Sequence, residues 1–197
     1  MSIYKVPENT NIEVTAQRTD ILHFMDVTGV EGVTGSDVWC QMGSGWTSMT
    51  ESPSAQTKER KFINEKSKRK NITGYAPSFG FEALLMFHNP TVRKVYDIYT
   101  QRKTGTNAVV PIVTVDAFEE AVNGAYPARK GKYAVEVSSC DDDDDMIIKG
   151  NFNGQGDEEI GYFNVKTGVW SDEKPTEQVD GQTENQGSTP ASENETE

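Results

Sequence analysis

The stretch "SFGFEALLMFHNPTVRKVYDIYTQRKTG", residues 78–105, decides the fold, because it joins a long apolar strand pattern to the strongest helix pattern of the chain. Its first part alternates, and the alternation predicts a strand with five apolar residues on one face: Phe79, Phe81, Ala83, Leu85 and Phe87. The later half of this part is apolar on both faces, which is typical of a strand covered on both sides.

The second part of the stretch predicts a helix over residues 90–103. Asn89 can cap the helix, and the fixed φ of Pro90 suits the first helical position. Four residues at i, i+3, i+4 and i+7 form an apolar stripe: Val92, Val95, Tyr96 and Tyr99. Arg102 and Lys103 favour the C-terminal dipole, and we expect Gly105 to take the left-handed position after the last turn.

Most of the remaining body reads as strands. The strand patterns cover residues 20–27, 107–115, 132–137 and 146–152, an earlier alternation of Ile12, Val14 and Ala16, and a hairpin over 161–170. Pro111 cannot donate a ladder hydrogen bond, so we expect an edge strand or a bulged strand there. A second, shorter helix is expected from Asp116 to the Asn123-Gly124 pair. The residues therefore predict an all-β body with one helix packed on it.

Charge divides the chain into two parts. The 31 acidic and 19 basic residues give −12, and residues 171–197 contribute eight acids against Lys174 alone. This acidic segment lacks the apolar surface that offsets ordering entropy, so we expect a disordered tail after a folded domain of residues 1–170. Excess negative charge argues against binding duplex DNA, and no apolar run is long enough to span a membrane. Cys40 and Cys140 are expected to be reduced thiols.

A long polar segment over residues 47–74 interrupts the strand patterns. It carries seven cations, with two apolar residues in its middle, and these nine residues are the predicted interface: Lys58, Arg60, Lys61, Phe62, Ile63, Lys66, Lys68, Arg69 and Lys70. The apolar pair favours a projecting β-arm over plain disorder. A solvated charged loop is the alternative, and the shortage of aromatics weakens a nucleic-acid interpretation. A basic arm on an acidic protein predicts a head-to-tail contact with another copy, which closes into rings or propagates into filaments.

Five consecutive aspartates form the second feature to explain: Asp141, Asp142, Asp143, Asp144 and Asp145. A calcium loop of the EF-hand type needs Gly and Glu where this chain has Met146 and Phe152, so that motif fails. Burying an unpaired carboxylate is costly, so the run is predicted to be a solvated hairpin loop between the strands at 132–137 and 146–152.

No constellation of residues predicts an enzyme, a metal site or a cofactor. His23 lies in a strand pattern and His88 just before a helix cap, and both are more often structural than catalytic in such places. The cysteines form no CxxC pair, and no G-x-S-x-G, Walker A or GxGxxG pattern is present.

The order of several segments over residues 10–170 resembles the tail tube proteins, or major tail proteins, of long flexible-tailed bacteriophages. The segments that carry the resemblance are "VWCQMGSGWTSMTESPSAQTKERKFINE", "ITGYAPSFGFEALLMFHNP", the helix, "RKTGTNAVVPIVTV" and "IIKGNFNGQGDEEIGYFNVKTGVW". The resemblance implies a mainly β (α+β) fold, a β-sandwich or barrel of the tail tube type, with one flanking α-helix and a long projecting β-arm. The acidic C-terminal segment departs from the family's pattern.

The resemblance also implies a function. Six copies would form a ring, and rings would stack into a tube within a virion whose parts are made in the host cytoplasm. The implied partners are other copies and the tape-measure, tail-tip and tail-terminator proteins, with no membrane. DNA would pass through the tube without specific binding, which fits an acidic lumen. The five aspartates would then face the lumen or ring rim, or the outer wall.

A second function class stays open from the sequence alone. A monomeric β-sandwich module that binds carbohydrate or protein would need exposed aromatics on one face, and the candidates are Trp39, Trp46 and Trp170.

Overall fold

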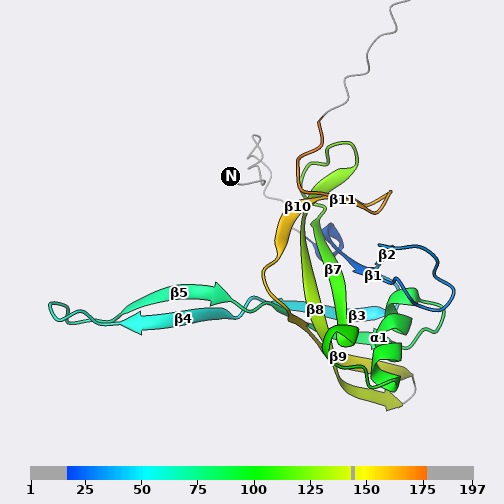
Figure 1. The fold of residues 1–197 in the computed structure, drawn as a ribbon, viewed down its shortest axis with the longest axis horizontal. Helices are drawn as coiled ribbons and strands as arrows, with labels where there is room; N and C mark the ends of the chain where they lie inside the picture. Colours follow the sequence, from blue (N-terminus) through cyan, green and yellow to red (C-terminus); the bar gives the residue numbers. More distant parts are fainter. Residues whose placement is uncertain (1–16, 143–144, 177–197) are drawn as a thin grey trace, which may run out of the picture.

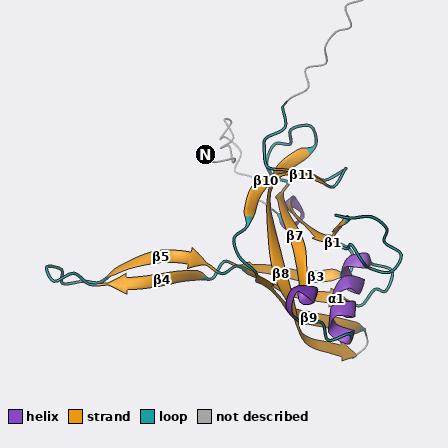
Figure 2. Ribbon diagram, in the orientation of Figure 1, coloured by secondary structure: helices purple, strands orange, loops and turns teal. Residues whose placement is uncertain are grey.

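The computed structural model describes residues 17–142 and 145–176 of the 197-residue chain. The described part is mainly β with one α-helix and a β-hairpin arm that projects from the body (Figures 1 and 2). The predicted fold class is confirmed. The elements are β1 (Ile21–Asp26), β2 (Trp39–Gln41), β3 (Trp46–Ser52), β4 (Ala55–Arg60), β5 (Arg69–Tyr75), β6 (Ser78–Leu84), α1 (Pro90–Thr100), β7 (Val109–Asp116), β8 (Ala125–Asp142), β9 (Met146–Gly154), β10 (Glu159–Asn164) and β11 (Val169–Ser171), with short 3₁₀ turns at Arg18–Asp20 and Gly105–Ala108.

One antiparallel sheet forms the body, in the order β2-β1-β7-β8-β9-β6-β3. The long strand β8 is its spine, since β7 pairs along one side while β10 and then β9 pair along the other. Its partner changes near Gly131, where an added Cβ would lie 2.8 Å from the ring of Tyr133. The sheet is curled. Its two faces carry two separate hydrophobic clusters.

The alternation of β7 feeds both clusters. Val110 and Ile112 point to the larger cluster, which α1 covers, and Val113 and Val115 point to the smaller one beneath β10 and β11. Phe79, Phe81 and Ala83 of β6 lie in the larger cluster, as their spacing predicts. Phe87 does not continue that strand. It follows the end of β6 and is exposed.

The helix α1 begins as predicted, because the Asn89 side chain accepts hydrogen bonds from the backbone N–H groups of Thr91 and Val92, at 3.0 and 3.4 Å. Its buried face differs from the predicted stripe, since Ile98 is buried while Tyr96 and Tyr99 are half-buried. The buried residues are Thr91, Val92, Val95 and Ile98.

Gly105 is left-handed as predicted, with φ 61°, but the left-handed residue that closes α1 is Arg102, with φ 50°. Lys103 N–H donates to the Ile98 carbonyl at 3.1 Å, and Arg102 N–H donates to that of Tyr99 at 3.2 Å. These two bonds form the Schellman arrangement, which closes the helix three residues before Gly105.

Two predictions about residues 107–124 are wrong. Pro111 lies in an interior strand, because β7 pairs with both β1 and β8 without a bulge. The ladder to β1 runs only from Ile112 to Asp116, so Pro111 lies where that side has no partner. The expected helix from Asp116 is a single turn at the end of β7, and the Asn123-Gly124 pair makes a tight reversal with both φ angles positive.

Some predictions lie partly or wholly outside the described residues. These are the alternation of Ile12, Val14 and Ala16, the aspartates Asp143 and Asp144, and residues 177–197 of the predicted tail. Residues 47–52 at the start of the predicted arm belong to β3 of the body, and the projecting hairpin is formed by β4 and β5.

Candidate subunit interface

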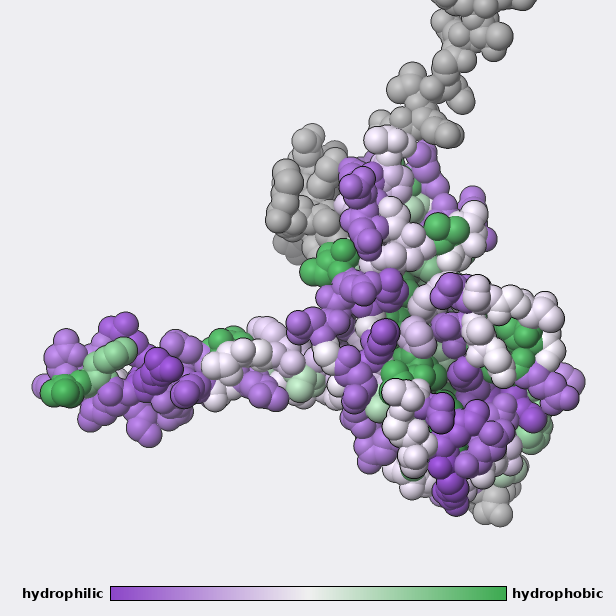
Figure 3. All heavy atoms as spheres, in the orientation of Figure 1, coloured by the Kyte–Doolittle hydropathy of each residue, from purple (hydrophilic) through white to green (hydrophobic). Residues whose placement is uncertain are grey.

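Among the described residues, the arm formed by β4 and β5 packs only on itself. All residues of β4 are exposed, and in β5 Gly74 alone is partly covered. Figure 3 shows the arm as a largely hydrophilic finger with a hydrophobic end, standing away from the body. An isolated two-stranded hairpin is marginally stable in water, so an arm of this kind gains most from a surface that covers it.

All nine predicted interface residues lie in the arm and are exposed: Lys58, Arg60, Lys61, Phe62, Ile63, Lys66, Lys68, Arg69 and Lys70. The pairing register arranges some of the cations on one face. Arg60 lies opposite Arg69, and Lys58 lies opposite Asn71 on the same face. Like charges directly opposite in a ladder are destabilising. Arg69 pairs with Glu65 at the arm tip, whereas Lys58 and Arg60 have no ion-pair partner within the described residues.

The opposite face of the arm is less charged. It carries the Glu59–Lys70 pair and the Thr57–Ile72 pair, and Ile72 is exposed. Glu59 also lies 3.4 Å from the ammonium of Lys68. The arm thus has two chemically different faces.

The tip of the arm is a turn in which Glu65 N–H donates to the Phe62 carbonyl at 3.1 Å. The Arg69 guanidinium pairs with Glu65 and stacks over the ring of Phe62, 5.5 Å from its centroid. Ile63 projects beyond these contacts and is fully exposed, at 108 % of its reference area. Its neighbour Phe62 is also exposed, so the tip ends in an adjacent pair of exposed apolar residues.

Of the aspartate run, Asp141, Asp142 and Asp145 are described, and they lie at the β8–β9 hairpin. Asp141 and Asp142 still belong to β8, where they pair with Ile147 and Met146. The Asp141 carboxylate lies 3.9 Å from the ammonium of Lys149. This hairpin and the arm lie on opposite sides of the body (Figure 1), so the structure does not bring the two charged features of one chain together.

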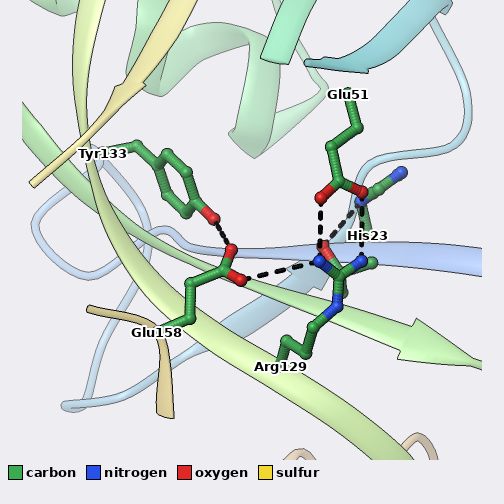
Figure 4. Close-up of polar contacts among 6 residues, drawn as sticks. His23, Glu51, Arg129, Tyr133 and Glu158 are labelled. Atoms are coloured by element: carbon green, nitrogen blue, oxygen red, sulfur yellow. Dashed lines mark hydrogen bonds and ion pairs between the residues drawn. The ribbon is translucent and has the colours of Figure 1, made fainter. Parts of the chain in front are cut away.

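A polar network at the root of the arm was not predicted from the sequence (Figure 4). Arg129 of β8 donates two hydrogen bonds to the Glu51 carboxylate of β3, at 2.8 and 3.0 Å. Its guanidinium also lies 3.5 Å from Glu158, which accepts a hydrogen bond from the Tyr133 hydroxyl. Glu51 and Arg129 are 78 residues apart, so no local spacing could have indicated the pair.

The network crosses the inside of the curled sheet. Two strands, β9 and β6, separate β8 from β3 in the sheet order. Neighbouring strands lie about 4.8 Å apart, so a flat sheet would hold these two strands roughly 14 Å from each other. The direct ion pair is possible because the sheet curls. It joins the central strand to the edge strand from which the arm leaves.

Burial and charge change the acidity of these groups in opposite directions. Hydrogen bonds from Arg129 lower the pKa of Glu51, and the same bonds raise the pKa of Arg129. Burial, followed by the contact with Glu158, raises the pKa of Tyr133. The pair is therefore fully ionised at neutral pH, while the tyrosine stays protonated.

His23 of β1 lies near this network and is a structural residue. Its Nδ1 lies 3.1 Å from the Thr114 hydroxyl, and its ring packs edge-on against Phe79 at 5.5 Å between centroids. Burial lowers the pKa of His23 to about 4, so the ring is neutral at pH 7. A cleft of about 530 Å³ between β1 and β3 is lined by His23, Glu51, Trp46, Met49 and Arg18 among others.

The tryptophans proposed for a binding module do not line one exposed face. Trp46 is buried, and its indole N–H donates to the Thr91 hydroxyl at 2.8 Å. Trp39 and Trp170 are half-buried and pack on the cluster around Phe163. No observation in the described residues favours the binding module.

The described residues also bear on metal binding and on membrane insertion. Within residues 17–142 and 145–176, no group of three or more His, Cys, Asp or Glu residues could hold a metal ion. The only α-helix in those ranges, α1, is neither long nor apolar enough to cross a membrane.

The arrangement defines a structural class: a curled antiparallel sheet with one covering helix and a projecting, exposed hairpin arm. No known protein family matches the sequence, and no curated protein matches it. Among solved structures, the chain is similar to a protein of the tail of an empty GTA particle, determined with C6 symmetry, at a TM-score of 0.50 and 12 % identity. The match covers 73 % of this chain and 97 % of the other.

A second solved structure, the six-fold symmetrised baseplate of the anti-feeding prophage, matches at a TM-score of 0.43 and 9 % identity, over 79 % of this chain and 99 % of the other. At identities this low, the likeness to the GTA tail protein shows the fold alone.

Proposed function

We propose that this chain is a non-enzymatic structural subunit of a phage-like tail tube, in which six copies form a ring and rings stack into a conduit. The single observation that carries the proposal is the arm. It is a long hairpin with a cationic face and a fully exposed isoleucine at its tip, and it stands away from the rest of the described residues. A segment of this kind is built to be covered by another molecule.

The fold supports the choice of assembly. The tail protein of the GTA particle shares the curled sheet, and its structure has C6 symmetry. The sheet of this chain ends in edge strands β2 and β3, and an open edge is a liability unless another strand or subunit covers it. Closing a ring of copies covers such edges, while the arm joins one ring to the next.

The charge distribution supports a conduit. A protein of net charge −12 repels phosphate, which lets DNA pass without specific binding. The predicted partners are other copies of the chain together with tape-measure, tail-tip and tail-terminator proteins. The assembled protein would belong to the virion, after synthesis in the host cytoplasm.

Electron microscopy of the purified full chain tests the proposal. We expect rings or striated tubes with six-fold symmetry in cross-section. Monodisperse monomers over the whole accessible concentration range, with and without seeds of sheared assemblies, would contradict it.

The role of the arm is tested with a matched pair of variants. K58E/R60E reverses the cationic face, and K132E/K166E reverses two exposed cations of the body with the same change in net charge. We expect K58E/R60E to raise the critical concentration for assembly at least about tenfold, equivalent to about 1.4 kcal/mol, while the control changes it little. Both variants should melt like the parent, since exposed substitutions cost about 0.5 kcal/mol or less. Normal tubes from K58E/R60E would refute the arm contact.

A further inference from the structure

An exposed apolar patch flanks the N-terminal end of α1, and α1 lies on the side of the body away from the arm (Figure 1). It consists of Met86, Phe87, Tyr96 and Met146, called here the Phe87 patch. Met86, Phe87 and Met146 are 43 %, 55 % and 43 % exposed. The Phe87 ring meets the Tyr96 ring edge-on at 5.8 Å, and the Met146 carbonyl accepts a hydrogen bond from Leu85 N–H at 2.8 Å. Phe87 and Tyr96 are thus in contact, and the bond to Leu85 holds Met146 beside the segment that carries Met86 and Phe87.

Nothing in the fold of the subunit requires this exposure. Four large apolar or aromatic side chains close together are typical of an interaction site, and methionine adapts its shape to a partner. Phe118, which is 50 % exposed in the turn after β7, lies in a different loop and offers a comparison residue.

Charge around the patch is unequal. On its β8–β9 side the exposed Asp145 stands next to Met146 in the chain. Asp141 pairs with Ile147, on the other face of the sheet from Met146, and there Lys149 lies 3.9 Å from both Asp141 and Glu82. The far end of α1 carries Arg102, which stacks on Tyr99 at 4.7 Å, and Lys103. A cationic ligand with an apolar end is favoured only if its charge lies towards the β8–β9 hairpin.

The arm tip combines apolar residues, which match the Phe87 patch, with cations. Phe62 and Ile63 are exposed apolar residues, and Lys66 and Lys68 follow them with exposed ammonium groups. The tip cannot reach the patch of its own chain, because the arm extends from the opposite side of the body (Figure 1). A contact between the two surfaces therefore joins different copies. Because the two surfaces differ, the contact is heterologous and can propagate.

We propose that the Phe87 patch is the docking site for the arm tip of a second copy, with Phe62 and Ile63 seated on Phe87 and Tyr96 and the tip lysines facing Asp145. The proposal rests on the proposed function, since it needs an assembly of copies. The proposed function specifies only the arm, and this proposal adds the surface that receives it. Each copy then offers one tip and one patch, so stacking continues without a further component.

Site-directed photo-cross-linking tests the contact in the full chain. A benzophenone amino acid replaces Ile63, and assemblies are formed from equal amounts of isotope-labelled and unlabelled chain. We expect cross-linked peptides that join residue 63 to residues 85–99 or 145–147, with mixed labels that show two different copies. Cross-links confined to other parts of the body would overturn the proposal.

A pair of surface variants gives an independent readout. F87S/M146S makes the patch polar, and F118S makes the same kind of change at the comparison residue. We expect F87S/M146S to raise the critical concentration for assembly at least tenfold with an unchanged melting temperature, and F118S to leave both nearly unchanged. Equal effects of the two variants on assembly would overturn the specific role of the patch.

The outcomes separate the two proposals. Tubes that form while residue 63 cross-links elsewhere leave the tube function standing and remove the patch. Complete failure of the parent chain to assemble, with seeds present, removes both, because the tip then has no second copy to meet.

Discussion

Arg129 of β8 joins the central strand to β3 across the inside of the curled sheet. Its guanidinium holds Glu51 through two parallel hydrogen bonds, and about a quarter of its side chain is exposed. Loss of one partner from such a pair leaves the other charge poorly solvated, so removal costs more than the net value of the pair. The pair also fixes β3 immediately before the arm begins.

Replacing Glu51 by Gln should destabilise the subunit by about 1–2 kcal/mol, because Arg129 loses its charged acceptor inside the sheet. Urea unfolding of the purified protein measures the change. The control is E159Q, which removes the partner of Lys130 in an ion pair of 2.6 Å whose carboxylate is 60 % exposed. Pairs this exposed are worth at most about 1 kcal/mol. An E51Q effect no larger than that of E159Q would show that the network is not structural.

His23 predicts a dependence of stability on pH. Burial lowers its pKa from 6.5 to about 4, so between these values the unfolded chain binds a proton that the folded chain does not. Stability therefore falls as pH decreases from 6.5 towards 4, by about 1.4 kcal/mol for each pH unit at most. The loss stops below the folded pKa.

Equilibrium unfolding at pH 6.5 and pH 4.5 measures this term. We expect H23Q to remove about 2 kcal/mol of the difference found in the parent chain. H88Q removes the other histidine, which is exposed, and should keep the difference. Glu51 adds a separate loss at lower pH, because its pKa is lowered and its pair is lost as it becomes protonated. An unchanged pH dependence in H23Q would contradict the buried neutral ring.

At the scale of elements, the β8–β9 ladder contains a close approach that only glycine permits. The register shifts between Val137 and Ser139, and Gly150 of β9 lies opposite this irregularity. A Cβ on Gly150 would overlap the carbonyl oxygen of Glu136 and lie 2.9 Å from the Phe81 ring. Backbone occupies the space, so no side-chain movement can relieve the overlap.

G150A should therefore destabilise the protein by at least about 3 kcal/mol or prevent folding, as overpacking against backbone does. Gly80 of β6 is the matched control. An added Cβ there would meet its nearest neighbour, the Asn151 side chain, at an ordinary 3.6 Å, so G80A should fold with near-parental stability. Circular dichroism melting of the two variants decides between them. Similar melting temperatures would show that β8 can shift at the bulge.

Elements with a strong local pattern could be predicted from the sequence. The spacing of Phe79, Phe81 and Ala83 gives the buried face of β6, and Asn89 with Pro90 gives the start of α1. The errors arose where tertiary structure overrides local preference. Pro111 is tolerated in an interior strand because β1 ends beside it. The segment after Asp116 forms turns instead of a helix, since Ala117 N–H donates to the Asp20 carbonyl and Val122 bridges to Ala125.

The candidate sites also differ in how far the sequence alone reveals them. The arm is visible in the sequence because its cations and its apolar pair are close together along the chain. The network of Glu51, Arg129 and Glu158 and the Phe87 patch join residues from distant segments, so only the fold reveals them. The sequence also gives no register, and the cationic face of the arm depends on Arg60 lying opposite Arg69.

At the scale of the whole molecule, assembly must overcome the repulsion between copies that each carry −12. Residues 177–197 hold six acids and no bases, so their removal changes the net charge from −12 to −6. The described residues before this segment contact the body, since Ser171 pairs with Tyr162 and the Asn123 side chain donates to the Thr176 carbonyl at 2.6 Å. Truncation after Thr176 therefore spares these contacts and should leave melting nearly unchanged.

The truncated chain should assemble at a lower concentration than the full chain at low salt. Halving the charge weakens repulsion between copies, while the cations of the arm and the Asp145 carboxylate beside the Phe87 patch are kept. The advantage should shrink near 0.1 M salt, where exposed charges more than about 10 Å apart are largely screened. Light scattering against protein concentration at several salt concentrations measures both effects. A chain shortened after Trp170 is the control, because it also loses the Ser171 and Thr176 contacts and should melt at a lower temperature. If truncation after Thr176 instead raises the critical concentration, residues 177–197 take part in the contact between copies, and the repulsion argument is wrong.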